Sequence, residues 1–197
     1  QATQLDQINT AISNGTNLLV VNIVETSSPD AAQQACDAAK NAGIPGYVLP
    51  RRDFSDSRGY TAALTRLLRE TVGADLVVMA GFMTILTEEL FQAYPNAVIN
   101  IHPSLIPSFC GRGMYGLKVH QAALDYGVKV TGATVHYVNE IPDGGEILLQ
   151  KAVEIAPDDT PETLQRRVMK QAEWQLLPLA AERVCAELVR EKEQKND

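Results

Sequence analysis

Short apolar runs alternate with expected helices through the first half of this chain. The runs at residues 18–24, 75–80 and 97–99 are rich in Val, Ile and Leu, which is typical of buried strands. The segments at 31–41 and 58–72 between them are expected to be helical. This alternation predicts an α/β fold with a mostly parallel, doubly wound sheet and helices on both faces.

The second half of the chain predicts a different pairing of strands. Residues 128–138 and 147–155 alternate apolar and polar side chains, as antiparallel or edge strands do, so we expect a mixed sheet. Thr160 and Pro161 are the cap and first residue of a long helix to about residue 195, with an interruption at Pro178. The other expected elements are helices at 1–13, 87–93 and 117–126 and a short strand at 46–50.

Composition limits the classes of function that the chain can have. A chain of 197 residues without repeats or low-complexity linkers indicates a single domain. Its net charge of −7 argues against binding a nucleic-acid backbone, but leaves small-molecule substrates open. The widely spaced Cys36, Cys110 and Cys185 fit reduced thiols in the cytoplasm. We expect no membrane span and no metal site, because no apolar run is long enough and no ligand cluster occurs.

The stretch from Asn100 to Phe109 contains the most closely spaced residues that could act in catalysis. We expect the strand before it to end near Asn100, because Pro103 and Pro107 forbid a regular ladder. Asn100 and His102 lie two apart, so they project to one side of an extended segment just past the carboxyl end of a strand. The amide can donate a hydrogen bond and the imidazole can move a proton near neutral pH. The alternative is a capping Asn and a hydrogen-bonded loop His.

Two further loops could complete a site. Asp143 stands in a tight loop before a strand, where its carboxylate could keep His102 protonated as a general acid. The alternative is an ordinary turn aspartate. The apolar loop at residues 80–86 follows another strand, and its backbone groups could bind a heterocycle; the alternative is plain core.

Together these segments resemble the glycinamide ribonucleotide formyltransferases. The likeness rests on residues 100–107, the loop Gly81-Phe82-Met83, the segment 135–138 and Asp143-Gly144-Gly145, in the family's order and close to its spacing. It covers nearly the whole chain. The resemblance implies a Rossmann-like formyltransferase domain over residues 1–197, with a nucleotide-binding N-terminal half and a folate-binding, catalytic C-terminal half. It also implies formyl transfer from 10-formyltetrahydrofolate to glycinamide ribonucleotide in purine synthesis.

The resemblance assigns roles to individual positions. Its catalytic residues are Asn100, His102 and Asp143, with His136 beside the site. Its folate-binding residues are Arg58, Met83, Thr84, Ile85, Leu86, Asn139, Glu140, Ile141 and Pro142. Its substrate-binding residues are Glu173, which contacts the ribose in the family, Ile101 and Pro103. The implied partners are small molecules only, and the chain would be a monomer or homodimer.

The sequence departs from the family pattern in places. The family opens with a strand and a glycine-rich loop that cradles the substrate phosphate, and we expect both to be missing here because Gln1 aligns just after them. Where the family has a Glu-His pair, this chain has Glu173-Trp174, so the histidine is replaced by tryptophan. In addition, Cys110 with Gly111-Arg112-Gly113 lengthens the loop after Pro107.

Other functions compete with this interpretation. Methionyl-tRNA formyltransferase resembles this core but carries a further domain and binds tRNA, and formyltetrahydrofolate deformylase has an added N-terminal domain and reads His-His-Ser at His102-Pro103-Ser104. A catalytically dead folate-binding homologue is the alternative outside enzymes. We also expect a cis peptide bond at Ile106-Pro107, a surface or packing role for His120, and a packing role for Trp174.

Overall fold

A computed structural model describes residues 18–21 and 45–196. The helices expected at 1–13 and 31–41 and the last residues of the first strand lie outside these ranges. Within them the sheet has the order β1-β2-β3-β4-β5. Its strands are β1 (Leu18–Val21), β2 (Leu76–Ala80), β3 (Val98–His102), β4 (Val130–Tyr137) and β5 (Ile147–Glu154).

The sheet changes direction at β3. The pairs β1–β2 and β2–β3 are parallel, whereas β3–β4 and β4–β5 are antiparallel. β3 therefore lies between a parallel and an antiparallel neighbour. The mixed α/β sheet expected from the sequence is confirmed.

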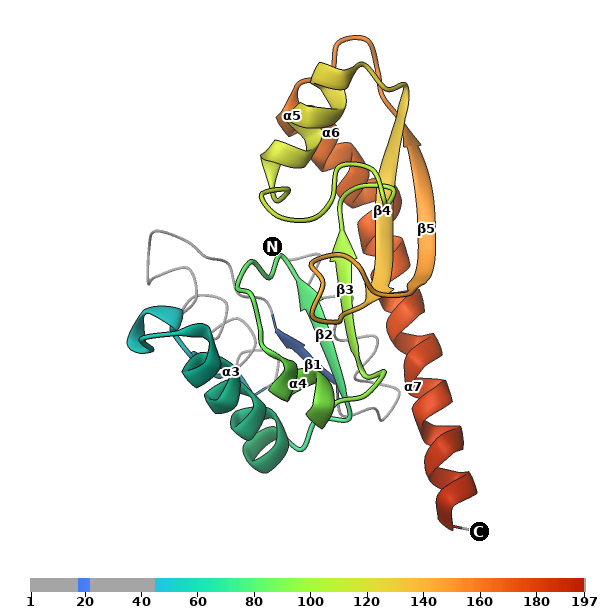
Figure 1. Cartoon of the computed structure of the whole chain (residues 1–197). Coiled ribbons are helices and arrows are strands. Elements are labelled where there is room, and N and C mark those ends of the chain that lie inside the picture. Colours follow the sequence, from blue (N-terminus) through green and yellow to red (C-terminus); the bar gives the residue numbers. More distant parts are fainter. Residues whose placement is uncertain (1–17, 22–44, 197) are drawn as a thin grey trace.

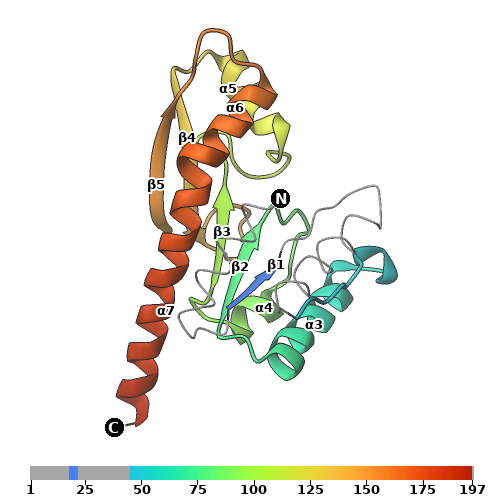
Figure 2. The ribbon, with the colours of Figure 1, turned by 180° about the vertical axis from the view of Figure 1, so that it is seen from behind.

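Helices cover both faces of this sheet (Figures 1 and 2). The helical segments are η1 (Arg51–Asp53), α3 (Ser57–Arg66), η2 (Leu67–Val72), α4 (Glu88–Ala93), α5 (Leu117–Tyr126), α6 (Pro161–Val168), η3 (Met169–Glu173) and α7 (Trp174–Asn196). Alternate residues of β2 point to opposite faces of the sheet and belong to two different hydrophobic clusters. Leu76 and Val78 pack with α6 and α7, while Val77 and Met79 pack with α3 and α4. The alternation explains why the whole strand is apolar.

Two strand predictions were wrong. Residues 46–50 form no strand; Tyr47 and Val48 are 44% and 45% exposed, and prolines flank the segment, so it gains little from burial and cannot complete a ladder. β3 does not end near Asn100 but continues to His102, because Asn100 and His102 pair with His136 and Thr134 of β4. The antiparallel neighbour extends the strand.

The late helix begins as expected. The Thr160 side chain accepts a hydrogen bond from the Thr163 N–H, and Pro161 occupies the first turn. The interruption expected at Pro178 was wrong, because α7 continues through this residue. The departure from α-helical geometry lies earlier, in the π-helical turn η3. A second π-helical turn, η2, extends α3 to the expected end at Val72.

Close contact between β4 and β5 depends on a glycine. A Cβ atom on Gly132 would overlap the carbonyl oxygen of Lys151 and stand 2.8 Å from Leu105 Cδ2. The carbonyl is strand backbone and cannot move aside, whereas Leu105 is half-buried and its side chain can shift. Glycine is therefore required for the two strands to approach here.

We predict that Gly132→Ala destabilises the protein by about 1–3 kcal/mol through overpacking. The measurement is the free energy of unfolding in urea. Gly59→Ala is the control, because a Cβ there meets nothing closer than 3.4 Å and the residue lies in α3, where Ala stabilises by up to about 1 kcal/mol. Equal stability of the two variants would contradict the requirement at Gly132.

Candidate active site

Neighbouring strands bring three polar side chains together at one end of the sheet. Asn100 and His102 lie on β3, and His136 lies opposite Asn100 on β4. Asn100 Nδ2 is 3.3 Å from His136 Nε2. Both histidines are buried, at 5% and 1% exposure. Their shared face follows from the two-residue period of a strand.

Asp143 joins this cluster from the loop between β4 and β5. Its Oδ2 is 3.6 Å from His102 Nδ1, and its Oδ1 is 3.6 Å from His136 Nε2. These separations make charge contacts rather than hydrogen bonds. The Gly111 N–H donates a true hydrogen bond to Oδ2 at 2.7 Å. The residue has a φ of 55°, a left-handed conformation tolerated best by Gly, Asn and Asp.

The contacts of the two histidines assign their protons. His102 Nε2–H donates to the Phe109 carbonyl at 2.9 Å, because a carbonyl oxygen can only accept. For the same reason, His136 Nδ1–H donates to the Tyr137 carbonyl at 2.7 Å. The other nitrogen of His102 faces a carboxylate. A proton on that nitrogen would lie between the ring and the carboxylate.

The surroundings hold Asp143 ionised. Burial acts to raise the pKa of this carboxyl, but His136, His102 and the Gly111 N–H outweigh it and lower the pKa below its ordinary value of 3.8. The carboxylate is therefore negative at neutral pH, beside two imidazoles.

The loop after β3 is fixed to β4 and α5. Thr134 Oγ1 donates to the Ser104 carbonyl at 2.7 Å and accepts from the Ile106 N–H at 3.1 Å. The Phe109 ring packs edge-on against Tyr126, with centroids 6.0 Å apart. The cis peptide bond expected at Ile106-Pro107 is confirmed. Backbone groups of this loop are thereby held against the cluster.

The residues predicted to bind folate lie on separate segments around this cluster. Met83, Thr84 and Ile85 are partly or well exposed after β2, whereas Leu86 is buried in the core. Asn139, Glu140, Ile141 and Pro142 are exposed in the same loop as Asp143, where Asn139 Oδ1 accepts from the Ile141 N–H. Arg58 lies on α3 and donates through Nε to Glu89 Oε1 at 2.9 Å. No contact joins Arg58 to the histidines among the described residues.

The predicted substrate-binding residues also differ in where they lie relative to the cluster. Pro103 follows His102 directly and is half-buried. The Ile101 side chain points away from the cluster into the core shared with α7, so only its backbone faces the site. Glu173 ends the π-helical turn η3, which packs against β4 and β5. Burial raises the pKa of Glu173 to about 7, so its charge changes near neutral pH.

His120 belongs to the core. It is fully buried on α5, and neither ring nitrogen has a hydrogen-bond partner among the described residues. Burial, reinforced by His102, lowers its pKa to about 4, so the ring is neutral at physiological pH. Of the two roles expected from the sequence, packing is the one observed.

Sequence reasoning missed the backbone groups of the cluster. The Phe109 carbonyl and the Gly111 N–H contact His102 and Asp143, but neither is a property of a side chain. One signal was available: Gly111 has a φ of 87°, which favours glycine. In the sequence this glycine stands out only as part of a longer loop after Pro107.

Two kinds of feature are absent from the described ranges. In residues 18–21 and 45–196, no three His, Cys, Asp or Glu side chains are grouped to hold a metal ion. No helix in the same part of the chain has both the length and the apolar character of a membrane-spanning segment.

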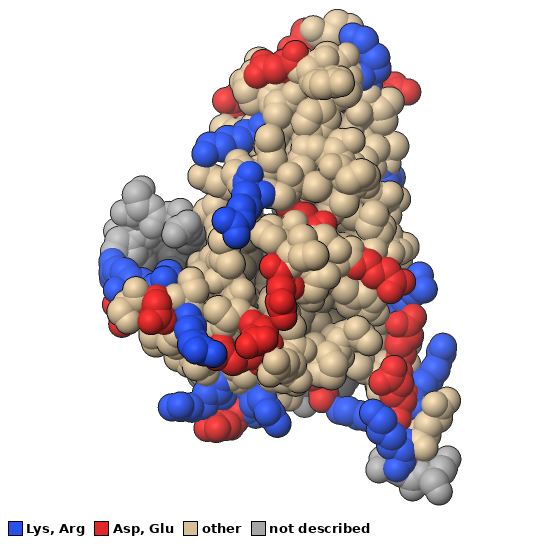
Figure 3. Space-filling view, in the orientation of Figure 1, with Lys and Arg blue, Asp and Glu red and all other residues tan. Residues whose placement is uncertain are grey.

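On the face in Figure 3, acidic and basic side chains are interspersed.

Comparisons with known proteins agree with each other. Residues 1–181 match the formyl transferase family. A chloroplastic phosphoribosylglycinamide formyltransferase of Arabidopsis thaliana is 40% identical over 156 residues, covering 79% of this chain. The chain spans about half of that relative, 53% of its length. The phosphoribosylglycinamide formyltransferase of Haemophilus influenzae is 37% identical over 91% of this chain and 80% of its own.

A solved structure gives the same result. The crystal structure of glycinamide ribonucleotide transformylase 1 from Symbiobacterium toebii superposes with a TM-score of 0.76 and 33% identity. The match covers 91% of this chain and 80% of that one.

We predict that Asp143→Asn weakens the acid sensitivity of the fold. Folding lowers the pKa of this carboxyl, so its ionised form stabilises the native state above the ordinary value of 3.8, and this contribution is lost as the pH falls through the folded value. Urea unfolding at neutral pH and near pH 3 should therefore show a smaller loss of stability in the variant. Asp158→Asn, at an exposed position, is the control. An equal loss in wild type and Asp143→Asn would contradict the prediction.

Proposed function

The chain belongs to the formyl transferase family, and we propose that it moves a formyl group from 10-formyltetrahydrofolate to the amine of glycinamide ribonucleotide, in de novo purine synthesis. The observation that carries this proposal is the buried cluster of Asn100, His102, His136 and Asp143. It joins hydrogen-bond donors to an ionised carboxylate, as a formyl transfer needs. The names of the relatives indicate the acceptor substrate and the group transferred. A family member needs a folate-type formyl donor, and the 10-formyl form is our choice.

The reaction is an addition followed by an elimination. The substrate amine attacks the formyl carbon, and the carbonyl oxygen becomes an oxyanion. One N–H of Asn100 Nδ2 faces His136 and the second is available to this oxygen. Protonated His102 stabilises the same charge. The tetrahedral intermediate then collapses, the bond to folate N10 breaks, and the proton lost by the amine reaches N10 through a water beside Asp143.

His102 must exchange a partner during this reaction. Its Nε2 proton is bound to the Phe109 carbonyl, and its Nδ1 faces Asp143. The formyl oxygen would replace the Phe109 carbonyl as acceptor. Phe109 has a φ of 51°, an unfavourable backbone conformation for this residue type. Release of this loop would therefore relieve some strain while it frees the proton.

The surrounding residues suit the two substrates. The exposed loops at 83–86 and 139–142 would hold the folate ring through backbone groups, and Arg58 would bind its carboxylate tail. Glu173 would accept hydrogen bonds from the ribose in its ionised form. Single-domain organisation, a cytoplasmic location, small-molecule partners alone and the choice between monomer and homodimer stay predictions.

We predict that Asn100→Ala lowers kcat about 100- to 1000-fold, the usual effect of losing an oxyanion donor. Folate affinity should change little, because the amide acts on charge that develops in the transition state. Turnover is followed by the absorbance of the released folate and affinity by calorimetry. Gln121→Ala, which removes an exposed amide on α5, is the control. A loss of affinity without a loss of kcat would make Asn100 a positioning residue.

We also predict that His102→Ala removes most turnover, because it deletes both the oxyanion donor and the partner of Asp143. Circular dichroism should show a retained fold. Wild-type turnover in this variant would remove His102 from the mechanism. If the wild-type chain bound folate but formylated no substrate, the binding homologue would replace the enzyme proposal.

A further inference from the structure

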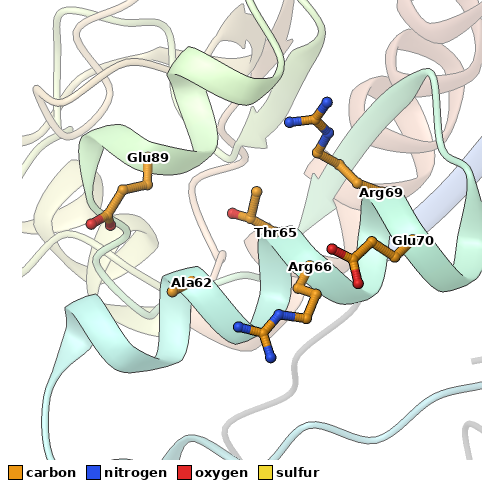
Figure 4. A pocket seen from close by; sticks show the side chains of 6 residues that line it. All are labelled: Ala62, Thr65, Arg66, Arg69, Glu70 and Glu89. Atoms are coloured by element: carbon orange, nitrogen blue, oxygen red, sulfur yellow. The ribbon is translucent and has the colours of Figure 1, made fainter.

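The reaction proposed above does not use a hollow of about 560 Å³ that lies between α3 with its extension η2 and α4 (Figure 4). Arg66, Arg69, Glu70 and Glu89 are among the residues that line it, so two carboxylates balance two guanidinium groups. Balanced charge of this kind favours no single class of ligand. A contact on the other side of the sheet, between β5 and the loop after β3, leads directly to His102.

Gln150 stands on β5 in the same row of the sheet as His102. His102 of β3 lies opposite Thr134 of β4, and Thr134 lies opposite Gln150. Residues directly opposite each other in a ladder project to one face, so the three side chains share a side of the sheet. The loop after His102 lies on this side as well, because a Cβ atom on Gly132 would stand 2.8 Å from Leu105 Cδ2. Gln150 is therefore within reach of that loop.

Every carbonyl of this loop from residue 104 to residue 109 accepts a hydrogen bond. Those bound from within the loop are the carbonyls of Leu105, Pro107 and Ser108. Those bound from the sheet are the carbonyls of Ser104, Ile106 and Phe109. Their donors are Thr134, Gln150 and His102, one from each of β4, β5 and β3. The loop is thus joined to the sheet at three carbonyls, and one of them accepts the His102 proton.

Gln150 also fixes the direction of the Thr134 hydroxyl. Its amide nitrogen has two protons and donates them to the Ile106 carbonyl at 3.0 Å and to Thr134 Oγ1 at 2.9 Å. The Ile106 N–H donates to the same hydroxyl oxygen at 3.1 Å. With two donors turned toward this oxygen, its single proton is left to point to the Ser104 carbonyl, 2.7 Å away. One amide thereby determines two of the three contacts between the loop and the sheet.

We propose that Gln150 is a positioning residue for His102. It holds the loop at Ile106, three residues before the Phe109 carbonyl, and so sets where that carbonyl meets the imidazole proton. The inference rests on the proposed function, in which this proton passes from the Phe109 carbonyl to the formyl oxygen. With Ile106 held, the segment beyond it releases the proton while the loop stays on the sheet.

The exposure of Gln150 separates this role from a structural one. The residue is exposed on β5, so water can replace its hydrogen bonds at little cost in stability. Loss of placement costs more in catalysis, since an error of about 1 Å can lower a rate about 100-fold. Substitution of Gln150 should therefore change turnover more than it changes the free energy of unfolding.

The test uses the nearly isosteric Gln150→Glu. A carboxylate cannot donate, so it would face the Ile106 carbonyl as a second acceptor and draw the Thr134 proton away from Ser104. We expect kcat for formyl transfer to fall about 10- to 100-fold, with KM for both substrates changed less than about twofold. The chain has three histidines, so the Nε2 signal of His102 can be followed by 15N NMR. It should shift as the bond to the Phe109 carbonyl is disturbed.

Two further variants complete the design. Gln194→Glu adds the same charge at an exposed position of α7 and should match wild type in kcat and in the His102 signal. Gln150→Met keeps the length of the side chain but has neither charge nor donor. It should shift the same signal and lower kcat by a smaller factor, because water can supply the missing donor. Circular dichroism checks the fold of each variant, and Gln150→Met decides the matter if Gln150→Glu does not fold.

The outcomes separate this inference from the proposed function. Wild-type kcat, or an unchanged His102 signal, in the folded Gln150 variants would overturn the positioning role. A raised KM with unchanged kcat would overturn it as well, since Gln150 would then act on substrate binding. Equal losses in Gln194→Glu would assign the effect to charge alone and overturn it too. If wild type formylates no substrate, the proposed function fails, and the His102 signal alone decides whether Gln150 positions this residue.

Discussion

The buried carboxylate of Asp143 is the group on which the arrangement of the site depends. It faces His102 on β3, His136 on β4 and the N–H of Gly111 in the loop after β3. This one carboxylate thus contacts all three segments. Its loss would leave the Gly111 N–H without its hydrogen-bond acceptor and both rings without their nearest charged neighbour. One side chain therefore sets the relative positions of β3, β4 and the loop.

The change of strand direction at β3 places these groups. Parallel pairing with β2 puts the end of β3 beside the loop at 83–86, while antiparallel pairing with β4 puts His136 beside Asn100. The loop that follows β4 then returns Asp143 over the same end of the sheet. A wholly parallel sheet would separate these segments by helical crossovers. The mixed sheet therefore gathers a polar cluster from positions that are close in space but distant in sequence.

Much of this could be predicted from patterns of side chains. Buried β2 follows from its apolar run, and the start of α6 follows from Thr160 and Pro161. The end of β3 could not be predicted, because the prolines are local signals and the pairing with β4 is not. Asn100, His102 and Asp143 could be selected by residue type and do lie close together, although their roles stay predictions, whereas the Phe109 carbonyl could not be selected, since every residue has one. Both features depend on contacts between segments, which local patterns of side chains do not reveal.

The loop holds His102 and Asp143 through its main chain alone, and this has a consequence for comparing sequences. The Phe109 carbonyl and the Gly111 amide belong to the main chain, so any side chains at positions 109 and 110 that keep the backbone path would preserve both hydrogen bonds. Substitutions there can accumulate without altering the hydrogen bonds, as long as the backbone path is kept. Among relatives, variable letters at these positions are compatible with an unchanged chemical role. The glycine at 111, with its left-handed backbone, leaves a trace that an alignment could register, whereas Phe109 is left-handed without being a glycine.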